Sequence, residues 1–436
     1  MNMDMDLTVA VELDNETSQD VTLVSVEQTS PDPERKSKYG HVCVVGMGYI
    51  GLPTASMLAS RGYSVAGVDV AIDVVETINR GQIHIVEPDL DIMVRSAVNS
   101  GELHASLEPE AADVFIIAVP TPFKDGKKPD LSFVLSATEM IAPYLVPGNL
   151  VILESTSPPG TTEEIVAKTL AEYGYSIGVD VFVAHCPERV LPGRILVELI
   201  ENDRVVGGVD EASTEKAVRF YETFVQGDVI GTSARTAELV KLAENSSRDV
   251  QIAFANEISM ICDQESLNTW EVIELANKHP RVNILNPGPG VGGHCIAVDP
   301  WFIVDRAPEC SNLIRMAREV NDAKPDWVLS RVRAKANKYK DPVIACLGLA
   351  FKADVDDLRE SPAYSIAENI LNENIGKLLV CEPNLDSHSV FDLVSLEEAV
   401  SSADILLLLV DHRQFRKISA AQLKEQVVID TRGIIK

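Results

Sequence analysis

A glycine motif between an apolar run and a helix-forming stretch constrains this chain more than any other feature. The residues from Val42 to Gly51 read VCVVGMGYIG, so Gly-x-Gly-x-x-Gly directly follows the apolar run and precedes the helical stretch from Thr54 to Arg61. The first glycine permits a tight turn, the second lets a pyrophosphate approach the backbone, and the third allows close helix packing. The motif predicts the first strand, turn and helix of a Rossmann fold, with a dinucleotide at the helix N-terminus.

An acidic residue at the end of the next predicted strand indicates which dinucleotide binds. Asp69 lies eighteen residues after Gly51, where a carboxylate accepts hydrogen bonds from both ribose hydroxyls. Neither Val70 nor Ala71 is an arginine that could receive a 2′-phosphate, so the sequence favours NAD over NADP. Polar residues at two further strand ends, which include Thr121 and Thr156, also suit the cofactor side of the sheet. Taken alone, they would be read as ordinary turn residues. The predicted cofactor-binding residues are Gly46, Gly48, Tyr49, Ile50, Gly51, Asp69, Thr121 and Thr156.

Two series of short apolar runs, separated by helix-length segments, indicate an α/β fold. Near-continuous Val/Ile runs are typical of strands buried on both faces of a parallel sheet. Between the two series, residues from about Ala212 to Ser266 carry no strand signal and follow helical spacing. The sequence therefore predicts two doubly wound Rossmann-like domains joined by a long central helical region. The expected divisions are an acidic, disordered extension (1–39), an NAD-binding domain (40–208), a central helical region with a cysteine loop (209–320) and a second Rossmann-like domain (321–436). Two stretches of the extension alternate between apolar and polar residues, so a strand docked on the folded protein is the alternative to disorder.

The charge and the cysteines exclude several classes of protein. The net charge of −28 repels nucleic acid and anionic membranes. No run of 18 apolar residues occurs and the first residues are acidic, so we expect a cytoplasmic protein without a membrane segment. Seven isolated cysteines encode neither a disulfide framework nor a zinc ribbon, so reduced thiols and no metal are expected.

One cysteine has unusual surroundings. Four glycines precede Cys295 in the segment PGPGVGGHC, which begins at Pro287. Such a backbone can come close to a ligand, and its N–H groups could favour a thiolate or an oxyanion. Cys295 is therefore the candidate nucleophile, although single cysteines are commonly inert small hydrophobes. A zinc site built from His294-Cys295 and His185-Cys186 is the less favoured alternative, because adjacent residues rarely bind one ion.

Polar residues share one face of the predicted central helix. Lys241, Asn245 and Arg248 are spaced i, i+4 and i+7. A lysine and an asparagine one turn apart can both reach a reacting oxygen, the lysine as acid or charge stabiliser and the amide as oxyanion donor. A solvated helix face is the alternative. The cationic candidates for an anionic ligand on so acidic a chain are Arg189, Arg281, Lys352 and Arg359.

With these motifs in this order, the chain from about residue 40 onward resembles the UDP-glucose/GDP-mannose dehydrogenase family. Three stretches, 79–88, 186–193 and 279–304, look like the branch that oxidises UDP-N-acetyl-D-mannosamine. The resemblance implies a four-electron oxidation of the C6 alcohol to a carboxylate with two NAD and one water. It also implies that residues 321–436 bind the UDP-sugar and that the central region forms a dimer interface, with acidic cell-surface polysaccharide precursors as the pathway.

The resemblance also implies roles for individual residues. Cys295 matches the thiol that captures the aldehyde as a thiohemiacetal and becomes a thioester. Lys241 matches the proton donor and acceptor, and Asn245 its oxyanion partner. Asp299 matches an acid linked to water or lysine positioning, and Glu188 an acid of the substrate loop implicated in thioester hydrolysis.

The family's binding residues carry over in the same way. Arg359 matches a residue that reaches NAD, and a neighbouring subunit could supply the loop of His279 and Arg281. The matched nucleotide-sugar contacts are Arg189, Val190, Lys241, Asn245, Arg248, His279, Arg281, Gly292, Phe351 and Lys352. Pro192 replaces a second acid of the UDP-glucose enzymes, so details of that loop do not transfer. His294 and Val298 also depart from those enzymes and point toward an N-acetylated sugar.

Three other interpretations stay open. A UDP-N-acetylglucosamine 6-dehydrogenase shares the Gly-Gly-His-Cys segment, and spacing does not reveal the sugar epimer. A two-electron hydroxyacid dehydrogenase would use Lys241 and Asn245 and leave Cys295 structural. A non-catalytic NAD-sensing or scaffold protein would keep the fold, but it would tolerate loss of Lys241 or Cys295, and both are present.

Overall fold

The computed structural model describes residues 40–191, 193–293, 295–419, 422–423 and 426–435. Outside these residues lie the predicted acidic extension, Pro192, and His294, which belongs to the alternative zinc site.

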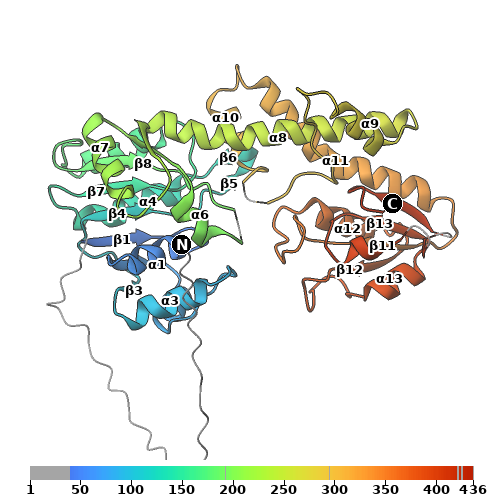
Figure 1. Cartoon of the computed structure of the whole chain (residues 1–436), viewed down its shortest axis with the longest axis horizontal. Helices are drawn as coiled ribbons and strands as arrows, with labels where there is room; N and C mark the ends of the chain where they lie inside the picture. The colour runs from blue at the N-terminus through green and yellow to red at the C-terminus, as the bar shows by residue number, and fades with distance from the viewer. Residues whose placement is uncertain (1–39, 192, 294, 420–421, 424–425, 436) are drawn as a thin grey trace, which may run out of the picture. The chain divides into compact units, whose positions relative to one another are not determined.

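The first sheet has eight strands, and the glycine motif follows β1, the first of them in the chain. Figure 1 shows β1 beside α1 (Gly51–Ser60), the helix that begins at the last glycine of the motif. The strand order is β10-β9-β8-β7-β4-β1-β2-β3, and all neighbours are parallel except β8 and β9. The strands are β1 (His41–Val45), β2 (Ser64–Val68), β3 (Leu103–Ser106), β4 (Val114–Ile117), β7 (Leu150–Leu153), β8 (Phe182–His185), β9 (Arg204–Gly208) and β10 (Val229–Ser233).

Helices cover both faces of this sheet because successive strand residues point to opposite sides. On β1, Val42 and Val44 belong to one hydrophobic core, whereas Cys43 and Val45 belong to the other. The first core is covered by α1 (Gly51–Ser60), α2 (Ile72–Asn79), α3 (Leu90–Asn99), α6 (Ile195–Glu201) and α7 (Glu211–Tyr221). The second is covered by α4 (Ser132–Ile141), the π-helical segment Thr162–Ala167 and α5 (Lys168–Glu172).

The second sheet repeats this architecture with four parallel strands in the order β12-β11-β13-β14. Its strands are β11 (Val343–Leu347), β12 (Lys377–Cys381), β13 (Ile405–Leu408) and β14 (Val427–Asp430). One face packs against α12 (Pro362–Asn372) and the C-terminal half of α11, and the other against α13 (Leu396–Ser402). Two doubly wound sheets therefore confirm the predicted fold class.

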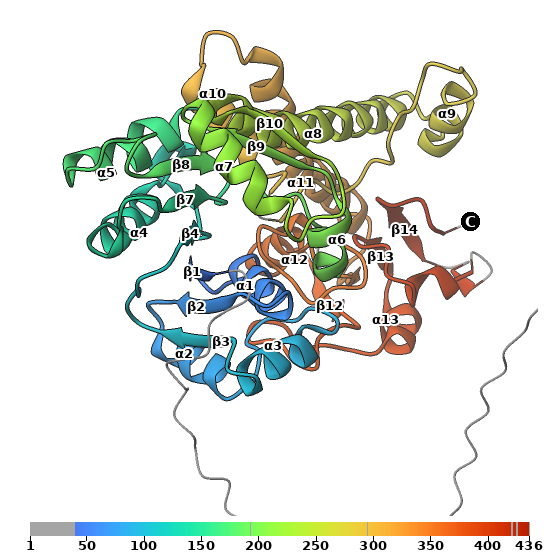
Figure 2. The same cartoon turned by 60° about the vertical axis from the view of Figure 1, so that its left-hand side comes forward.

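Long helices lie between the two sheets in the chain, as predicted (Figure 2). They are α8 (Ala234–Gln264), α9 (Thr269–Ala276), α10 (Asp299–Arg306) and α11 (Asn312–Ala336). Capping side chains fix two of the starts: Ser233 accepts from Thr236 N at α8, and Asn268 accepts from Trp270 N at α9. The α8–α11 contact is polar and buried, since Arg318 binds Asp249 at 2.6 Å and Asn256 donates to Asn321 at 2.8 Å.

Two details differ from the sequence-based expectation. Strand β10 lies where only helix was predicted, because its residues are half-buried or exposed and give no apolar run. The first sheet therefore reaches Ser233, beyond the division drawn at residue 208. The division drawn at 320/321 falls inside α11, because that helix packs on α8 at one end and on the second sheet at the other.

A small hairpin was also not predicted. Strands β5 (Phe123–Lys124) and β6 (Lys128–Pro129) pair antiparallel. The Phe123 ring packs edge-on against Phe302 of α10, and Lys127 forms an ion pair with Asp322 of α11. The hairpin thus connects the first sheet to the central helices.

Candidate active site

The glycine motif forms the expected turn between β1 and α1. Gly46 has a φ of +93°, which favours glycine, and its N–H donates to Val68 O at 2.8 Å. A Cβ atom at Gly51 would lie 1.7 Å from the carbonyl oxygen of Gly46, so this position cannot carry a side chain. A Cβ atom at Gly48 would meet no atom within 4 Å. The turn is therefore closed on its sheet side and open at Gly48, which fits the approach of a pyrophosphate.

The other predicted cofactor residues follow strands that are neighbours in the sheet. Asp69 follows β2, and its two oxygens accept from Met47 N and Ala71 N, both at 3.0 Å. These two bonds hold the half-buried carboxylate beside the glycine turn. Thr121, which follows β4, donates to the carbonyl of Thr156, which follows β7, at 2.8 Å. These residues fit NAD at the carboxyl ends of parallel strands.

The cysteine loop and the central helix meet at one polar cluster. Asn245 of α8 donates to the Oδ2 atom of Asp299 at 2.6 Å. Asp299 begins α10, is 3% exposed, and its N–H donates to Cys295 O at 2.9 Å. Lys241 lies one turn before Asn245 on α8 and acts electrostatically on both Cys295 and Asp299. Four predicted catalytic residues, Cys295, Lys241, Asn245 and Asp299, are thus brought together.

Desolvation dominates the electrostatics of this cluster. It raises the pKa of the Asp299 carboxyl to about 6, against the lowering effects of Lys241 and the Asn245 hydrogen bond. It also raises the pKa of the Cys295 thiol, and the Asp299 carboxylate raises it further, whereas Lys241 and Arg359 lower it. Cys295 is reached by solvent, but protein surrounds it closely enough for desolvation to be the largest effect. The cations are therefore what favours a thiolate here.

The second sheet's first loop packs against the cysteine loop. Gly293 has a φ of +83°, and a Cβ atom there would lie 2.9 Å from the ring of Phe351. The Gly293 N–H donates to Arg359 O at 3.3 Å. A Cβ atom at Gly292 would lie 2.4 Å from the carbonyl oxygen of Glu360. The glycines before Cys295 thus permit close packing of this loop.

Arg359 connects the thiol site to the glycine motif. Its guanidinium lies 5.0 Å from the ring centre of Tyr49 and forms a two-pronged contact with Asp357. Because Arg359 also lowers the pKa of Cys295, it acts at both sites. Arg359, which is predicted to reach NAD, thus lies beside Tyr49 of the glycine motif.

Glu188 lies in a separate buried cluster. One of its oxygens accepts from Arg189 N at 2.7 Å, and the other accepts from Arg204 of β9 at 2.6 Å. Glu154 is nearby and is bonded to the Tyr221 hydroxyl at 2.7 Å. Desolvation, followed by the charge of Glu188, raises the pKa of Glu154 to about 7. Both oxygens of Glu188 are therefore already engaged, which favours a positioning role for this carboxylate.

The remaining predicted substrate residues are spread over several elements. Arg189 forms an ion pair with Glu244 of α8 at 2.7 Å, and Val190 packs against the first core. The other four are exposed, and no contact among the described residues brings any of them to the thiol. They are Arg248, His279, Arg281 and Lys352.

Two buried glutamates near the site were missed by sequence reasoning. Glu238 is fully buried and accepts from Gly160 N, Thr162 N and the Thr162 hydroxyl at 2.5 to 2.7 Å, so it ties α8 to the loop after β7. It lies one turn before Lys241, and this spacing was the available signal. Glu87 accepts from Gly193 N and Ile195 N at 2.9 and 2.8 Å and holds the loop after β8.

The described residues, 40–435 with their gaps, lack two kinds of feature. Within them, no helix is long and apolar enough to cross a membrane. In the same part of the chain, no three His, Cys, Asp or Glu side chains are grouped so that they could hold a metal ion.

Comparison with known proteins identifies the family. Residues 40–225 match the NAD binding domain of the UDP-glucose/GDP-mannose dehydrogenase family, residues 235–323 its central domain and residues 345–436 its UDP binding domain. The chain belongs to this family. It is a nucleotide-sugar dehydrogenase with NAD as its cofactor, which confirms the predicted family and cofactor.

Several members of the family are closely similar. An NDP-N-acetyl-D-galactosaminuronic acid dehydrogenase of Ralstonia nicotianae is 58% identical over 404 residues, covering 90% of this chain and 96% of the relative. A UDP-N-acetyl-D-mannosamine dehydrogenase of Escherichia coli (strain K12) is 52% identical over 417 residues, covering 91% and 99%. A solved structure of the UDP-N-acetyl-mannosamine dehydrogenase of S. aureus has a TM-score of 0.84 at 44% identity, covering 91% of this chain and 96% of that one.

The open position at Gly48 generates a prediction for this family member. Gly48→Ala should leave the melting temperature unchanged, because its methyl group meets no atom of the chain. It should weaken NAD binding at least about tenfold, or about 1.4 kcal/mol, because the methyl group fills the space that the pyrophosphate needs. Calorimetric titration with NAD and a thermal melt measure the two effects.

Gly51→Ala is the contrasting variant, since its methyl group would collide with Gly46 O and lower the melting temperature. Unchanged NAD affinity in Gly48→Ala would contradict this assignment of the turn.

Proposed function

We propose that this enzyme oxidises the C6 hydroxyl of UDP-N-acetyl-D-mannosamine to a carboxylate, using two NAD and one water, through a covalent Cys295 thioester. The observation that carries the proposal is the cluster in which Cys295 lies beside Lys241, Asn245 and Asp299. An oxidation that stops at an aldehyde or ketone needs no thiol, whereas capture of an aldehyde does. The mannosamine dehydrogenases at 50–53% identity support the choice of sugar.

Bound NAD supplies the hydride acceptor, once for the alcohol and once for the thiohemiacetal. Gly46, Gly48 and Gly51 would hold its pyrophosphate and Asp69 its ribose. Lys241 takes the proton from O6 as the first hydride leaves C6. The Cys295 thiolate then adds to the aldehyde carbon, and the Asn245 amide and Lys241 stabilise the oxyanion.

Loss of the second hydride converts the thiohemiacetal to a thioester. Water attacks this carbonyl, the C–S bond breaks, and Cys295 regains its thiolate. Per sugar, one alcohol, one water and two NAD⁺ give one carboxylate, two NADH and three protons. Asp299 keeps Asn245 and Lys241 in place and receives protons, while Glu188, held by Arg204, positions the substrate loop.

A second sugar is a specific alternative. The relative at 58% identity is named for N-acetyl-D-galactosaminuronic acid, so an NDP-N-acetyl-D-galactosamine substrate is the second candidate. The chemistry at C6 would be the same. UDP-N-acetylglucosamine, the third candidate, differs from the mannosamine substrate only in its configuration at C2.

We also propose that the enzyme is cytoplasmic and that it forms a homodimer or a higher homo-oligomer. In support, α8 presents Phe254 and Ile261, spaced i and i+7 and each about half exposed, on one stripe of its surface. Such a stripe suits the face of a second copy. By the same family argument, the product would enter the synthesis of acidic polysaccharides.

Product stoichiometry tests the proposed reaction. We expect two NADH per UDP-N-acetyl-D-mannosamine and a uronate product by mass spectrometry, with slower or no turnover of the galactosamine, glucosamine and glucose analogues. Cys295→Ser should stop the second oxidation, because a serine alkoxide does not form readily at this site. One NADH per sugar with released aldehyde in the wild type would overturn the thioester role. Preference for the galactosamine nucleotide would establish the second candidate.

The raised pKa of Asp299 predicts the pH dependence of turnover. Because this pKa is about 6, kcat should fall as the pH decreases through about 6 and the carboxylate becomes protonated. Asn245→Ala removes a hydrogen bond that lowers this pKa, so the acidic limb of the residual activity should move to higher pH. Asp299→Asn should remove the limb and lower kcat throughout. An acidic limb that stays at the same pH in both variants would assign it to another group.

A further inference from the structure

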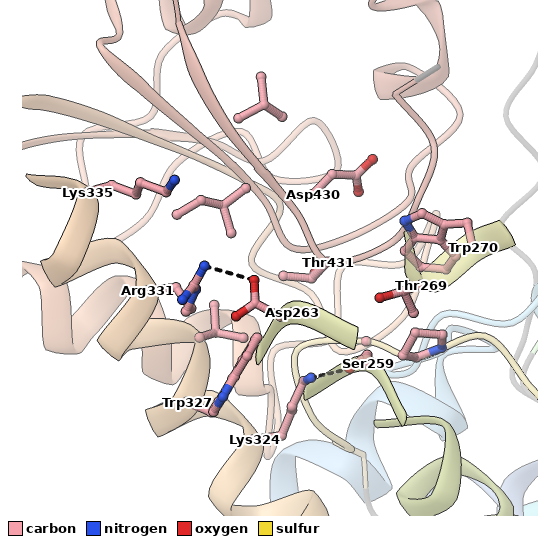
Figure 3. A pocket seen from close by; sticks show the side chains of 15 residues that line it. Ser259, Asp263, Thr269, Trp270, Lys324, Trp327, Arg331, Lys335, Asp430 and Thr431 are labelled. Atoms are coloured by element: carbon pink, nitrogen blue, oxygen red, sulfur yellow. Dashed lines mark hydrogen bonds and ion pairs between the residues drawn. The ribbon is translucent and has the colours of Figure 1, made fainter. Parts of the chain in front are cut away.

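A polar cavity of about 250 Å³ lies at the far end of the α8–α11 pair (Figure 3). Its walls come from α8, the start of α9, α11 and the last strand, β14. In the view of Figure 3, Trp327 and Trp270 lie on opposite sides of the cavity, with Lys324 and Ser259 below. The proposed reaction uses none of these side chains.

The cavity is distant from the thiol site along α8. Ser259 and Asp263 line the cavity, whereas Lys241 and Asn245 belong to the thiol site. Lys241 and Ser259 are eighteen residues apart on one helix, which is roughly 27 Å at 1.5 Å per residue. A ligand in the cavity therefore cannot contact the reacting C6 atom.

Lys324 is a buried cation in this cavity without a close carboxylate. The residue is 3% exposed, and its Nζ atom donates to Ser259 Oγ at 2.5 Å and to Asn256 O at 3.4 Å. The same atom lies 4.4 Å from the ring centre of Trp327. Among the residues described here, no carboxylate oxygen lies within 4.0 Å of it. A buried ammonium group without an ion pair is costly, and an anion would relieve that cost.

The carboxylates of the cavity are already engaged. Asp263 forms an ion pair with Arg331 at 2.8 Å. Asp430 accepts from three backbone N–H groups of the following turn, those of Arg432, Gly433 and Ile435. The lining contains three cations, Lys324, Arg331 and Lys335, and only these two carboxylates. It therefore has an excess of one positive charge. This excess is notable on a chain with a net charge of −28.

The turn after β14 also fixes one aromatic wall. Gly433 has a φ of +67°, and a Cβ atom there would lie 2.4 Å from the indole of Trp270. The turn therefore packs directly on this ring and holds it at the cavity. Hydroxyl groups of Ser259, Thr269 and Thr431 add neutral hydrogen-bonding partners.

We propose that this cavity binds a sugar-sized organic oxyanion, a carboxylate or a phosphate ester, whose charge pairs with Lys324. The volume exceeds that of a bare inorganic anion, and the hydroxyls and indoles suit the polar and apolar faces of a sugar ring. Such a ligand would contact α8, α11 and β14 together and so hold the second sheet against the central helices.

The electrostatics add a pH dependence to this binding. Desolvation lowers the pKa of Lys324 to about 8, and Asp263 partly opposes this effect. Lys324 contacts Ser259 and Asn256 of α8 and Trp327 of α11. The charged groups that line the cavity with it are Asp263 of α8, Arg331 and Lys335 of α11, and Asp430 of β14. Lys324 is charged below pH 8, so oxyanion binding should weaken as the pH rises from 7 to 9.

Tryptophan fluorescence provides a direct readout, because two of the three tryptophans of the chain line the cavity. D-glucuronate and glucose 1-phosphate are the carboxylate and phosphate probes, D-glucose is the neutral control, and saturating UDP blocks the substrate site. We expect one or both anions, but not glucose, to change the fluorescence with a saturable curve that UDP does not abolish. The anion with the lower Kd identifies the chemistry.

Variants separate binding from folding. Lys324→Met, which keeps the stem and removes the charge, should raise the Kd at least tenfold, whereas Lys338→Met, beyond the end of α11, should not change it. If Lys324→Met melts early, Trp270→Phe tests the same cavity from a half-buried position, and the Kd, followed through Trp327, should rise. No saturable response to either anion, or an equal response to glucose, would overturn the proposal. The titration measures binding and not turnover, so either result leaves the proposed oxidation to be judged by its own test.

Discussion

The buried ion pair between Arg318 and Asp249 is the constraint on which the thiol site depends. Arg318 is 1% exposed, lies on α11 and reaches Asp249 of α8 at 2.6 Å. The same guanidinium donates to the carbonyl oxygen of Ile296, the residue after Cys295, at 3.3 Å. One side chain therefore connects the helix that carries Lys241 and Asn245 to the loop that carries the thiol. Loss of one partner of such a buried pair typically costs about 3–5 kcal/mol, because a charge is left without compensation.

In both Rossmann-like sheets, an acidic residue after the second strand accepts a hydrogen bond from the turn after the first strand, but the surroundings of the two acids differ. In the first, Asp69 follows the second strand and accepts from Met47 N of the glycine turn. In the second, Glu382 follows β12 and accepts from Leu349 N at 2.7 Å in the corresponding turn. The buried His412 contacts Glu382 at 3.1 Å, whereas Asp69 stays half-buried at the cofactor turn. The acid of the second sheet is thus used within the protein, which fits a domain that holds a different ligand from the first.

Elements whose structure depends on residues close to one another in the chain were predictable from the sequence. The apolar runs at His41–Val45 and Val343–Leu347 are strands because both faces of each are buried, and a continuous run reports that burial directly. The turn at Gly46 to Gly51 was predictable because the positive φ of Gly46 and the close packing at Gly51 favour glycine at these two positions. By contrast, β10 is half exposed and carries no apolar run, so its pairing with β9 was not visible.

The site was predictable only in part, for the same physical reason. Lys241 and Asn245 are one helical turn apart, and Asp299 follows Cys295 by four residues, so both pairs have local spacings. The contacts of Arg318 with Asp249, of Glu238 with Thr162 and of Arg204 with Glu188 join residues that lie 16 to 76 positions apart. Only the folded chain brings these partners together, and a single sequence gives no signal for them.

In the proposed reaction, Cys295 carries the sugar as a covalent acyl group. Mass spectrometry of the Cys295 peptide, after acid quench within the first turnovers with UDP-N-acetyl-D-mannosamine and NAD, tests it most directly. We expect a peptide that carries the sugar acid as a thioester, which hydroxylamine releases as a hydroxamate. An unmodified Cys295 peptide, together with free aldehyde in the quenched solution, would contradict it.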